Sequence, residues 1–282
     1  MTLLRTLLLC TVLGSVSAAA ADQGNLTLAI HPFKPPTELI DAFTPLANYL
    51  ARRTDHTITI IISKSYQDHI DSIGKSGVDI AYVGPASYVK LRETYGPQRL
   101  LARQAINGQP TFHGKIFVRN DSSIHSLHDL IGKRFAFGDA NSTMSFLVPY
   151  YMLVQAGVER EKLASAGTVT GHVNNVMAIL AGDYDAGAVK EDVFYEYEKR
   201  GIRAIATSPP IADHVFVASD HLAEKTVSLL RVALLELSQQ TDGAAILDAI
   251  TPGVTALLPV NDEDYSNLRD ILTELKKHGV EP

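Results

Sequence analysis

Residues 134–158 read RFAFGDANSTMSFLVPYYMLVQAGV, and this stretch decides the fold. Residues 135–137 predict a short apolar strand, 138–142 a polar turn, and the apolar-rich run 144–156 a helix. The first backbone N–H groups of a helix have no partner within it, and the helix dipole is positive at that end. A strand, a polar turn and a helix start in this order can therefore hold an anion.

Hydroxyl side chains add to this helix start. Ser142, Thr143 and Ser145 can join the free amides in holding a phosphate-sized oxyanion without Lys or Arg. The alternative is ordinary N-capping by Ser142 or Thr143, which many helices use. The stretch alone leaves both interpretations open.

The composition excludes several classes of protein. The chain has 282 residues, of which 46% are hydrophobic and 20% charged, so it is long enough for one large or two medium domains. Its formal net charge is -6 and it has no block of Lys and Arg, so we expect a globular protein without a nucleic-acid partner.

The first 21 residues predict a cleavable signal peptide. Arg5 supplies the positive start, residues 7–16 a short apolar core, and 16–21 small residues suited to cleavage. The apolar run is shorter than the roughly 20 residues that a membrane span needs, so we expect a soluble chain secreted to a periplasm. The only cysteine, Cys10, lies in this segment, so the processed chain would have no disulfides.

Strands and helices alternate along the rest of the chain. Strands are predicted near residues 26–30, 57–62, 78–83, 100–104, 115–119, 135–137, 184–189, 202–207 and 215–218, and the tail from 223 is predicted to be mostly helical. This order predicts an α/β fold with open, mostly parallel sheets that have helices on both faces and bind ligands at the carboxyl ends of strands.

Two extended segments predict how the chain divides. Residues near 108–114 and 205–212 can each cross between two lobes, which would form a two-strand hinge beside a cleft. We therefore expect a signal peptide in 1–21, one lobe in 22–110 plus 210–282, and the other lobe in 111–209.

Four blocks of the sequence resemble one known family. They are DIAYVGPASY at 79–88, SLHDLIGKRFAFGDANST at 126–143, GH at 171–172 with GDYDAGAV at 182–189, and SPPIAD at 208–213. In order and spacing they resemble the periplasmic phosphate-, phosphite- and phosphonate-binding proteins of ABC transporters. The resemblance covers about residues 27–222.

The resemblance implies a two-lobed, type II solute-binding protein of the Venus-flytrap kind. Such a protein captures a small oxyanion of phosphorus and delivers it to an ABC permease at the membrane. We therefore expect a monomer without cofactor, metal or catalytic residue.

The resemblance also implies positions that bind the ligand. Ser142 and Thr143 match hydroxyls that hold the phosphorus-bound oxygens, and His172 matches an assisting histidine. Tyr66 matches a tyrosine at the start of the second helix, with a half-buried core tyrosine as the alternative. If His172 pairs with the anion as an imidazolium, affinity should weaken as the pH rises through the histidine range.

Three further candidates have plain structural alternatives. Asp192 and Asp213 match acidic residues that receive an ammonium or a P–OH group, but either can be an N-cap or a solvated acid. Tyr82, in the block at 79–88, is a candidate whose alternative is packing.

The chain departs from the family pattern at its centre. Met144 and Ser145 stand where the pattern has Ser and Gly, and Phe112 stands where it has a cleft-lining Tyr. We keep all three as candidate ligand-binding residues, although two hydroxyl donors of the family pattern are lost. Each hydrogen bond to a charged group contributes about 1.5 to 3 kcal/mol to binding. The ligand is therefore a phosphonate, phosphite or phosphate-like ion, or a different oxyanion or less charged solute.

Two other functions fit the same residues. A sensory module that presents its closed form to a membrane histidine kinase is the alternative to uptake, and the sequence does not separate them. An enzyme is a third class, because Ser, His and Asp lie around the proposed cleft. We expect no enzyme, because no G-x-S-x-G motif occurs.

Overall fold

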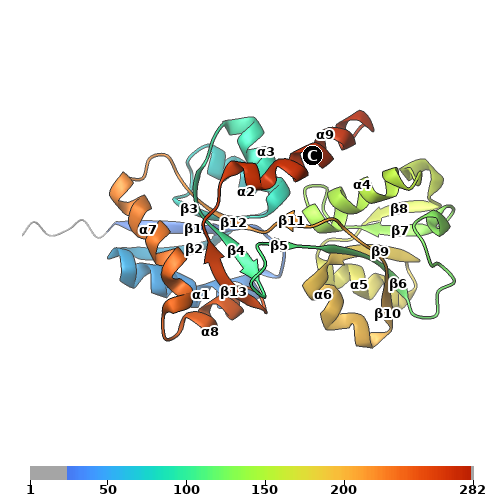
Figure 1. The fold of residues 1–282 in the computed structure, drawn as a ribbon, viewed down its shortest axis with the longest axis horizontal. Helices are drawn as coiled ribbons and strands as arrows, with labels where there is room; N and C mark the ends of the chain where they lie inside the picture. The colour runs from blue at the N-terminus through green and yellow to red at the C-terminus, as the bar shows by residue number, and fades with distance from the viewer. Residues whose placement is uncertain (1–23, 281–282) are drawn as a thin grey trace, which may run out of the picture.

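The structure, a computed structural model, describes residues 24–280, so the predicted signal peptide lies outside the described residues. The chain forms two lobes, each built on a mixed sheet with helices on both faces (Figure 1). Within residues 24–280, no helix is long and apolar enough to cross a membrane.

The first lobe holds a six-stranded sheet in the order β13-β4-β12-β3-β1-β2. Its strands are β1 (Asn25–Ile30), β2 (Thr57–Ile62), β3 (Ile80–Val83), β4 (Arg99–Ile106), β12 (Val215–Ala218) and β13 (Val254–Leu258). Its helices are α1 (Pro36–Thr54), α2 (Tyr66–Gly74), α3 (Pro85–Tyr95), α7 (Glu224–Glu236) and α8 (Gly243–Ile250). Alternate residues of β1 point to opposite faces of the sheet. Leu28 packs with α1, α7 and α8, and Ala29 packs with α2 and α3.

The second lobe holds a five-stranded sheet in the order β10-β6-β9-β7-β8. Its strands are β6 (Gly114–Arg119), β7 (Arg134–Phe137), β8 (Ser165–Thr168), β9 (Ala186–Lys190) and β10 (Ile202–Thr207), and its helices are α4 (Val148–Gln155), α5 (His172–Ala181) and α6 (Glu191–Tyr197). Short 3-10 helices cover His128–Leu130, Arg160–Lys162, Glu198–Arg200, Leu237–Gln239 and Asp262–Tyr265.

Both sheets are mixed rather than mostly parallel. The strands β1, β2 and β3 are parallel, as are β7, β8 and β9. However, β12 returns from the second lobe and runs opposite to its neighbours β3 and β4, while β6 enters the second lobe and runs opposite to β9 and β10. The antiparallel pairs thus arise where the chain crosses between the lobes. In addition, β13 pairs antiparallel with β4, although the helical pattern of the tail does not predict this strand.

Three segments connect the lobes. The short strands β5 (Thr111–Phe112) and β11 (Ile211–Ala212) pair with each other in the crossing region. The third segment is the C-terminal helix α9 (Ser266–Lys277), which contacts α3 of the first lobe and α4 of the second (Figure 1). Its residues Leu268, Leu272 and Leu275 are buried in the core that both lobes share.

The helix predicted at 144–156 begins differently from the expectation. Residues Thr143–Leu147 form a π-helical turn, and the α-helix α4 begins only at Val148. Pro149 lies in the first turn of α4, and because proline has no N–H it cannot donate to the carbonyl of Ser145 four residues earlier. That carbonyl instead accepts a hydrogen bond from the backbone N–H of Gly138 at 2.8 Å. The strand, turn and helix are therefore tied together around residues 138–145.

Candidate functional site

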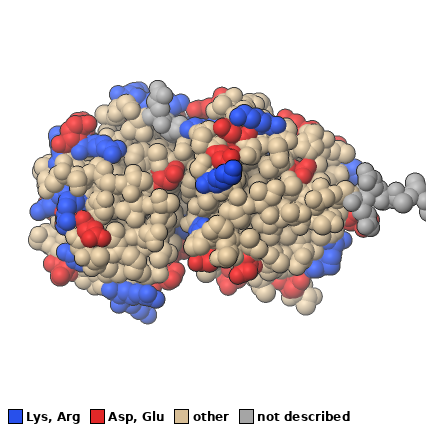
Figure 2. All heavy atoms as spheres, turned by 180° about the vertical axis from the view of Figure 1, so that it is seen from behind, with Lys and Arg blue, Asp and Glu red and all other residues tan. Residues whose placement is uncertain are grey.

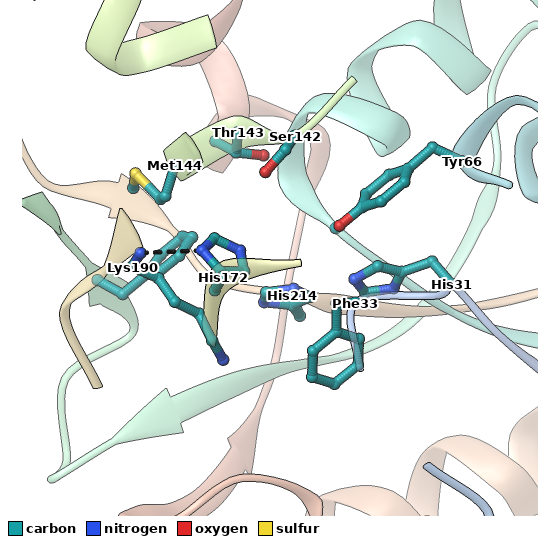
Figure 3. A pocket seen from close by; sticks show the side chains of 11 residues that line it. His31, Phe33, Tyr66, Ser142, Thr143, Met144, His172, Lys190 and His214 are labelled. Carbon is teal, nitrogen blue, oxygen red and sulfur yellow. Dashed lines mark hydrogen bonds between the residues drawn. The ribbon is translucent and has the colours of Figure 1, made fainter. Parts of the chain in front are cut away.

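A small cavity lies between the lobes at this turn (Figure 3). The first lobe contributes His31, Phe33, Tyr66 and Gly84 to its lining, and the crossing region contributes Phe112 and His214. The second lobe contributes Ser142, Thr143, Met144, His172 and Lys190. The cavity volume is about 20 Å³, which is room for one or two water-sized groups. This inner cavity therefore suits a compact polar group.

A larger cavity of about 130 Å³ shares part of this lining. Phe33, Tyr66, Ser142 and His172 line both cavities. The larger one also has residues of both lobes in its wall, among them Ser145. Basic and acidic side chains are interspersed over the face of the molecule that Figure 2 shows.

The two hydroxyls of the predicted turn act as caps and also line the cavity. The Ser142 hydroxyl oxygen accepts hydrogen bonds from the Ser145 backbone N–H at 3.4 Å and from the Ser145 hydroxyl at 2.7 Å. The Thr143 oxygen accepts from the backbone N–H of Ala86, in the first turn of α3, at 3.0 Å. The latter bond joins the two lobes. Because both oxygens serve as acceptors, each hydroxyl keeps its own proton to donate.

Tyr66, the first residue of α2, faces these hydroxyls from the other lobe (Figure 3). Burial raises the pKa of its phenol, and the nearby Asp139 carboxylate raises it further, against a smaller opposing effect of the Ser142 hydroxyl. The phenol is therefore a neutral hydrogen-bond donor at physiological pH.

His172, the first residue of α5, is a neutral donor. Its Nδ1 accepts a hydrogen bond from the backbone N–H of Lys190 at 3.3 Å, which leaves the ring proton on Nε2. Burial, together with the Lys190 ammonium, lowers the pKa of His172 to about 3. The hypothesis that His172 binds as an imidazolium is therefore not supported.

Lys190 lines the cavity, but its ammonium points away from the Ser142 and Thr143 hydroxyls (Figure 3). Its ammonium lies 2.8 Å from Asp192 Oδ2 and 5.3 Å from the centre of the Phe33 ring. Burial alone would raise the pKa of Asp192, but the Lys190 ammonium outweighs that effect and lowers it. Asp192 is therefore ionised. Its side chain is absent from the lining of both cavities.

His214, like Lys190, bonds to a neighbouring acidic residue. Its Nδ1–H donates to Asp213 Oδ1 at 2.7 Å, and its ring stacks on Tyr82 with the centroids 4.9 Å apart. Asp213 is fully buried, and among the described residues its Oδ2 has no hydrogen-bond partner. The Tyr82 hydroxyl donates to Gln104 Oε1 at 2.6 Å.

The structure thus sorts the predicted residues into two layers. Six of them line the inner cavity: Tyr66, Phe112, Ser142, Thr143, Met144 and His172. Ser145 lines the outer cavity and bonds to Ser142. Tyr82, Asp192 and Asp213 are absent from both linings. Asp192 bonds to Lys190, Asp213 bonds to His214 through Oδ1, and the Tyr82 hydroxyl bonds to Gln104.

Besides Gly84, which has no side chain, four lining residues were not predicted: His31, Phe33, Lys190 and His214. A sequence signal existed for two of them. His31 directly follows β1, and Lys190 ends β9. Carboxyl ends of strands are where sheets of this kind bind ligands.

A two-lobed α/β fold with a donor-lined cavity between the lobes defines a solute-binding protein. Residues 28–265 match the family model described as "ABC transporter, phosphonate, periplasmic substrate-binding protein". The chain belongs to this phosphonate-binding family of periplasmic proteins.

Named relatives agree with this assignment. The chain is 25% identical to the phosphate-import protein PhnD of Mycolicibacterium smegmatis, over 88% of this chain and 84% of the relative. It is 25% identical to the probable ABC transporter phosphite binding protein PhnD1 of Prochlorococcus marinus, over 83% of this chain and 84% of that protein.

Solved structures show the same fold. The structure of Prochlorococcus marinus PhnD1 in complex with methylphosphonate matches with a TM-score of 0.82 at 24% identity, covering 90% of this chain and 98% of that one. A binding protein component of an ABC phosphonate transporter from Pseudomonas aeruginosa matches with a TM-score of 0.80 at 20% identity, covering 91% and 87%.

Proposed function

We propose that this chain binds a small oxyanion of phosphorus in the inner cavity and delivers it to an ABC permease. The observation that carries this proposal is the convergence of donors from both lobes on one enclosed space. Ser142, Thr143 and His172 of the second lobe face Tyr66 of the first (Figure 3). Neutral donors in a small cavity, with one nearby ammonium, suit a compact anion.

The family supports uptake over the other functions. The two relatives named above are an import protein and a transporter-associated binding protein, rather than enzymes. The names of these relatives give phosphate and phosphite as their ligands, and the Prochlorococcus structure holds methylphosphonate. We extend this ligand class to the present chain, together with secretion by a cleaved signal peptide, action as a monomer in the periplasm, and partnership with a permease. The sensory alternative has no comparable support.

The size of the inner cavity narrows the ligand class. A volume of about 20 Å³ is room for only one or two water-sized groups, so it favours the smallest oxyanions. No carboxylate lines the inner cavity among the described residues, and the two nearby acids are occupied by Lys190 and His214. We therefore favour phosphite, phosphate or methylphosphonate over an aminoalkylphosphonate, whose ammonium would find no carboxylate among the described residues that line the inner cavity.

A thermal-shift screen tests the proposal. A ligand that binds only the folded state raises the unfolding midpoint, so phosphite, phosphate or methylphosphonate should raise it, and sulfate and aminoethylphosphonate should raise it less. The Ser142→Ala/Thr143→Ala variant is the control and should fold but show no shift. If none of the phosphorus oxyanions shifts the midpoint of the unaltered chain, the proposed function is wrong.

A further inference from the structure

The inner cavity contains a hydrogen-bond acceptor among its donors. The Nδ1 atom of His31 lies 3.2 Å from the backbone carbonyl oxygen of Tyr82. Because a carbonyl can only accept, Nδ1 must carry a proton. In a neutral imidazole, the other nitrogen, Nε2, is then an unprotonated acceptor.

The Nε2 atom of His31 borders the cavity at Gly84. A Cβ atom added to Gly84 would lie 3.7 Å from His31 Nε2 and 3.7 Å from His214 Nε2. All three residues line the inner cavity. The two imidazoles therefore present their Nε2 atoms to the same small space, and each has its Nδ1 occupied as a donor.

The groups around His31 keep it neutral. Burial lowers its pKa well below the ordinary value, and His214, His69 and Lys190 act in the same direction, against a smaller opposing effect of the Tyr82 carbonyl. These neighbours come from every side: His69 from α2, Lys190 from β9 and His214 from the segment before β12. The phenols of Tyr66 and Tyr82 also face the ring and remain protonated, because burial raises their pKa values.

We propose that His31 Nε2 accepts the hydrogen bond of a P–OH group, so that the site selects the singly protonated monoanion of its ligand. This inference rests on the proposed function. In a fully ionised dianion, an oxygen lone pair would face the lone pair of Nε2, whereas the monoanion supplies the missing proton. A sulfonate has the shape and charge of the monoanion but no hydroxyl, so it too would leave Nε2 unpaired.

Calorimetry with methylphosphonate and methanesulfonate tests this inference on the unaltered chain. We expect methanesulfonate to bind roughly 10- to 100-fold more weakly, the worth of one hydrogen bond to a charged group. We also expect methylphosphonate affinity to fall as the pH rises past the second ionisation of the ligand. Equal affinities for the two ligands, or tighter binding of the methylphosphonate dianion, would overturn the inference.

Two variants separate His31 from its neighbours. His31→Phe should reduce the preference for methylphosphonate over methanesulfonate to less than about threefold. His69→Gln is the matched control, because His69 also bonds to the Tyr82 carbonyl, at 3.2 Å, but does not line the cavity; this variant should keep the preference. If His31→Phe keeps the full preference, His31 is not the acceptor. If phosphite and methylphosphonate fail to bind the unaltered chain at any pH, the proposed function itself fails.

Discussion

The backbone N–H of Lys190 donates a hydrogen bond to His172 Nδ1 at 3.3 Å and thereby fixes the proton of His172 on Nε2. Lys190 thus lines the cavity and, through its backbone, sets the tautomer of the histidine beside it. The bond joins the last residue of β9 to the first residue of α5.

We predict that His172 stays neutral over the whole physiological range. Because its pKa lies at about 3, its ring resonances should not move between pH 5.5 and 8.5 in NMR titrations of the ligand-free protein. A midpoint near pH 6.5 for His172 would show that it can bind as an imidazolium.

Acid should destabilise the protein before its carboxylates titrate. The pKa of His69 is lowered to about 4 and that of His172 to about 3, in both cases mainly by burial. The unfolded chain therefore binds more protons than the folded one below about pH 6.5, and stability falls with pH from there towards about pH 4. Between pH 7 and pH 4.5 we expect each histidine to cost roughly 2 to 3 kcal/mol.

Urea denaturation at a series of pH values measures this loss. His125 and His128 are exposed, so His125→Gln and His128→Gln should leave the pH dependence unchanged. A free energy of unfolding that is constant from pH 7 to 4.5 would mean that the buried histidines do not stay neutral.

The hydroxyl of Thr143, rather than the shape of its side chain, should determine its contribution to ligand affinity and stability. Thr143→Val removes both the donor to the ligand and the acceptor of the buried Ala86 N–H, so it should weaken methylphosphonate binding at least about tenfold and cost about 1 to 3 kcal/mol of stability. Thr143→Ser keeps both roles and should bind within about threefold of the unaltered chain. Calorimetry and urea denaturation measure the two effects, and equal binding by the Val and Ser variants would remove Thr143 from the site.

Lys190 should contribute to anion affinity. Lys190→Met removes the ammonium and should weaken methylphosphonate binding roughly 10- to 100-fold. The variant also leaves Asp192 without its partner, so Lys190→Met/Asp192→Asn should regain stability without regaining affinity. Lys115 is equally buried in the same lobe but bonds to Thr207, so Lys115→Met is the matched control. Calorimetry that finds equal losses for both lysine variants would contradict a local role.

The sequence could predict the parts of the site that are local in the chain. The turn at 142–145 follows from a short pattern, and the family resemblance adds Tyr66, Phe112 and His172. The structure brings all of these residues except Ser145 to the inner cavity.

The rest of the lining depends on pairing that is not local. His214 reaches the cavity because β12 runs antiparallel beside β3, with Val215 opposite Val83, and so its amino end meets the carboxyl end of β3. No pattern near residue 214 reveals that neighbour. Likewise, Asp192 and Asp213 match ligand-binding acids by motif, but in the folded chain they bond to Lys190 and His214 and do not line the inner cavity.

The most direct test is a crystal structure of the chain grown with methylphosphonate. We predict one methylphosphonate in the inner cavity, with its oxygens within hydrogen-bond distance of the Ser142 and Thr143 hydroxyls and of His172 Nε2. A well-ordered ligand bound elsewhere, or a cavity that stays filled only by water at saturating methylphosphonate, would contradict the account.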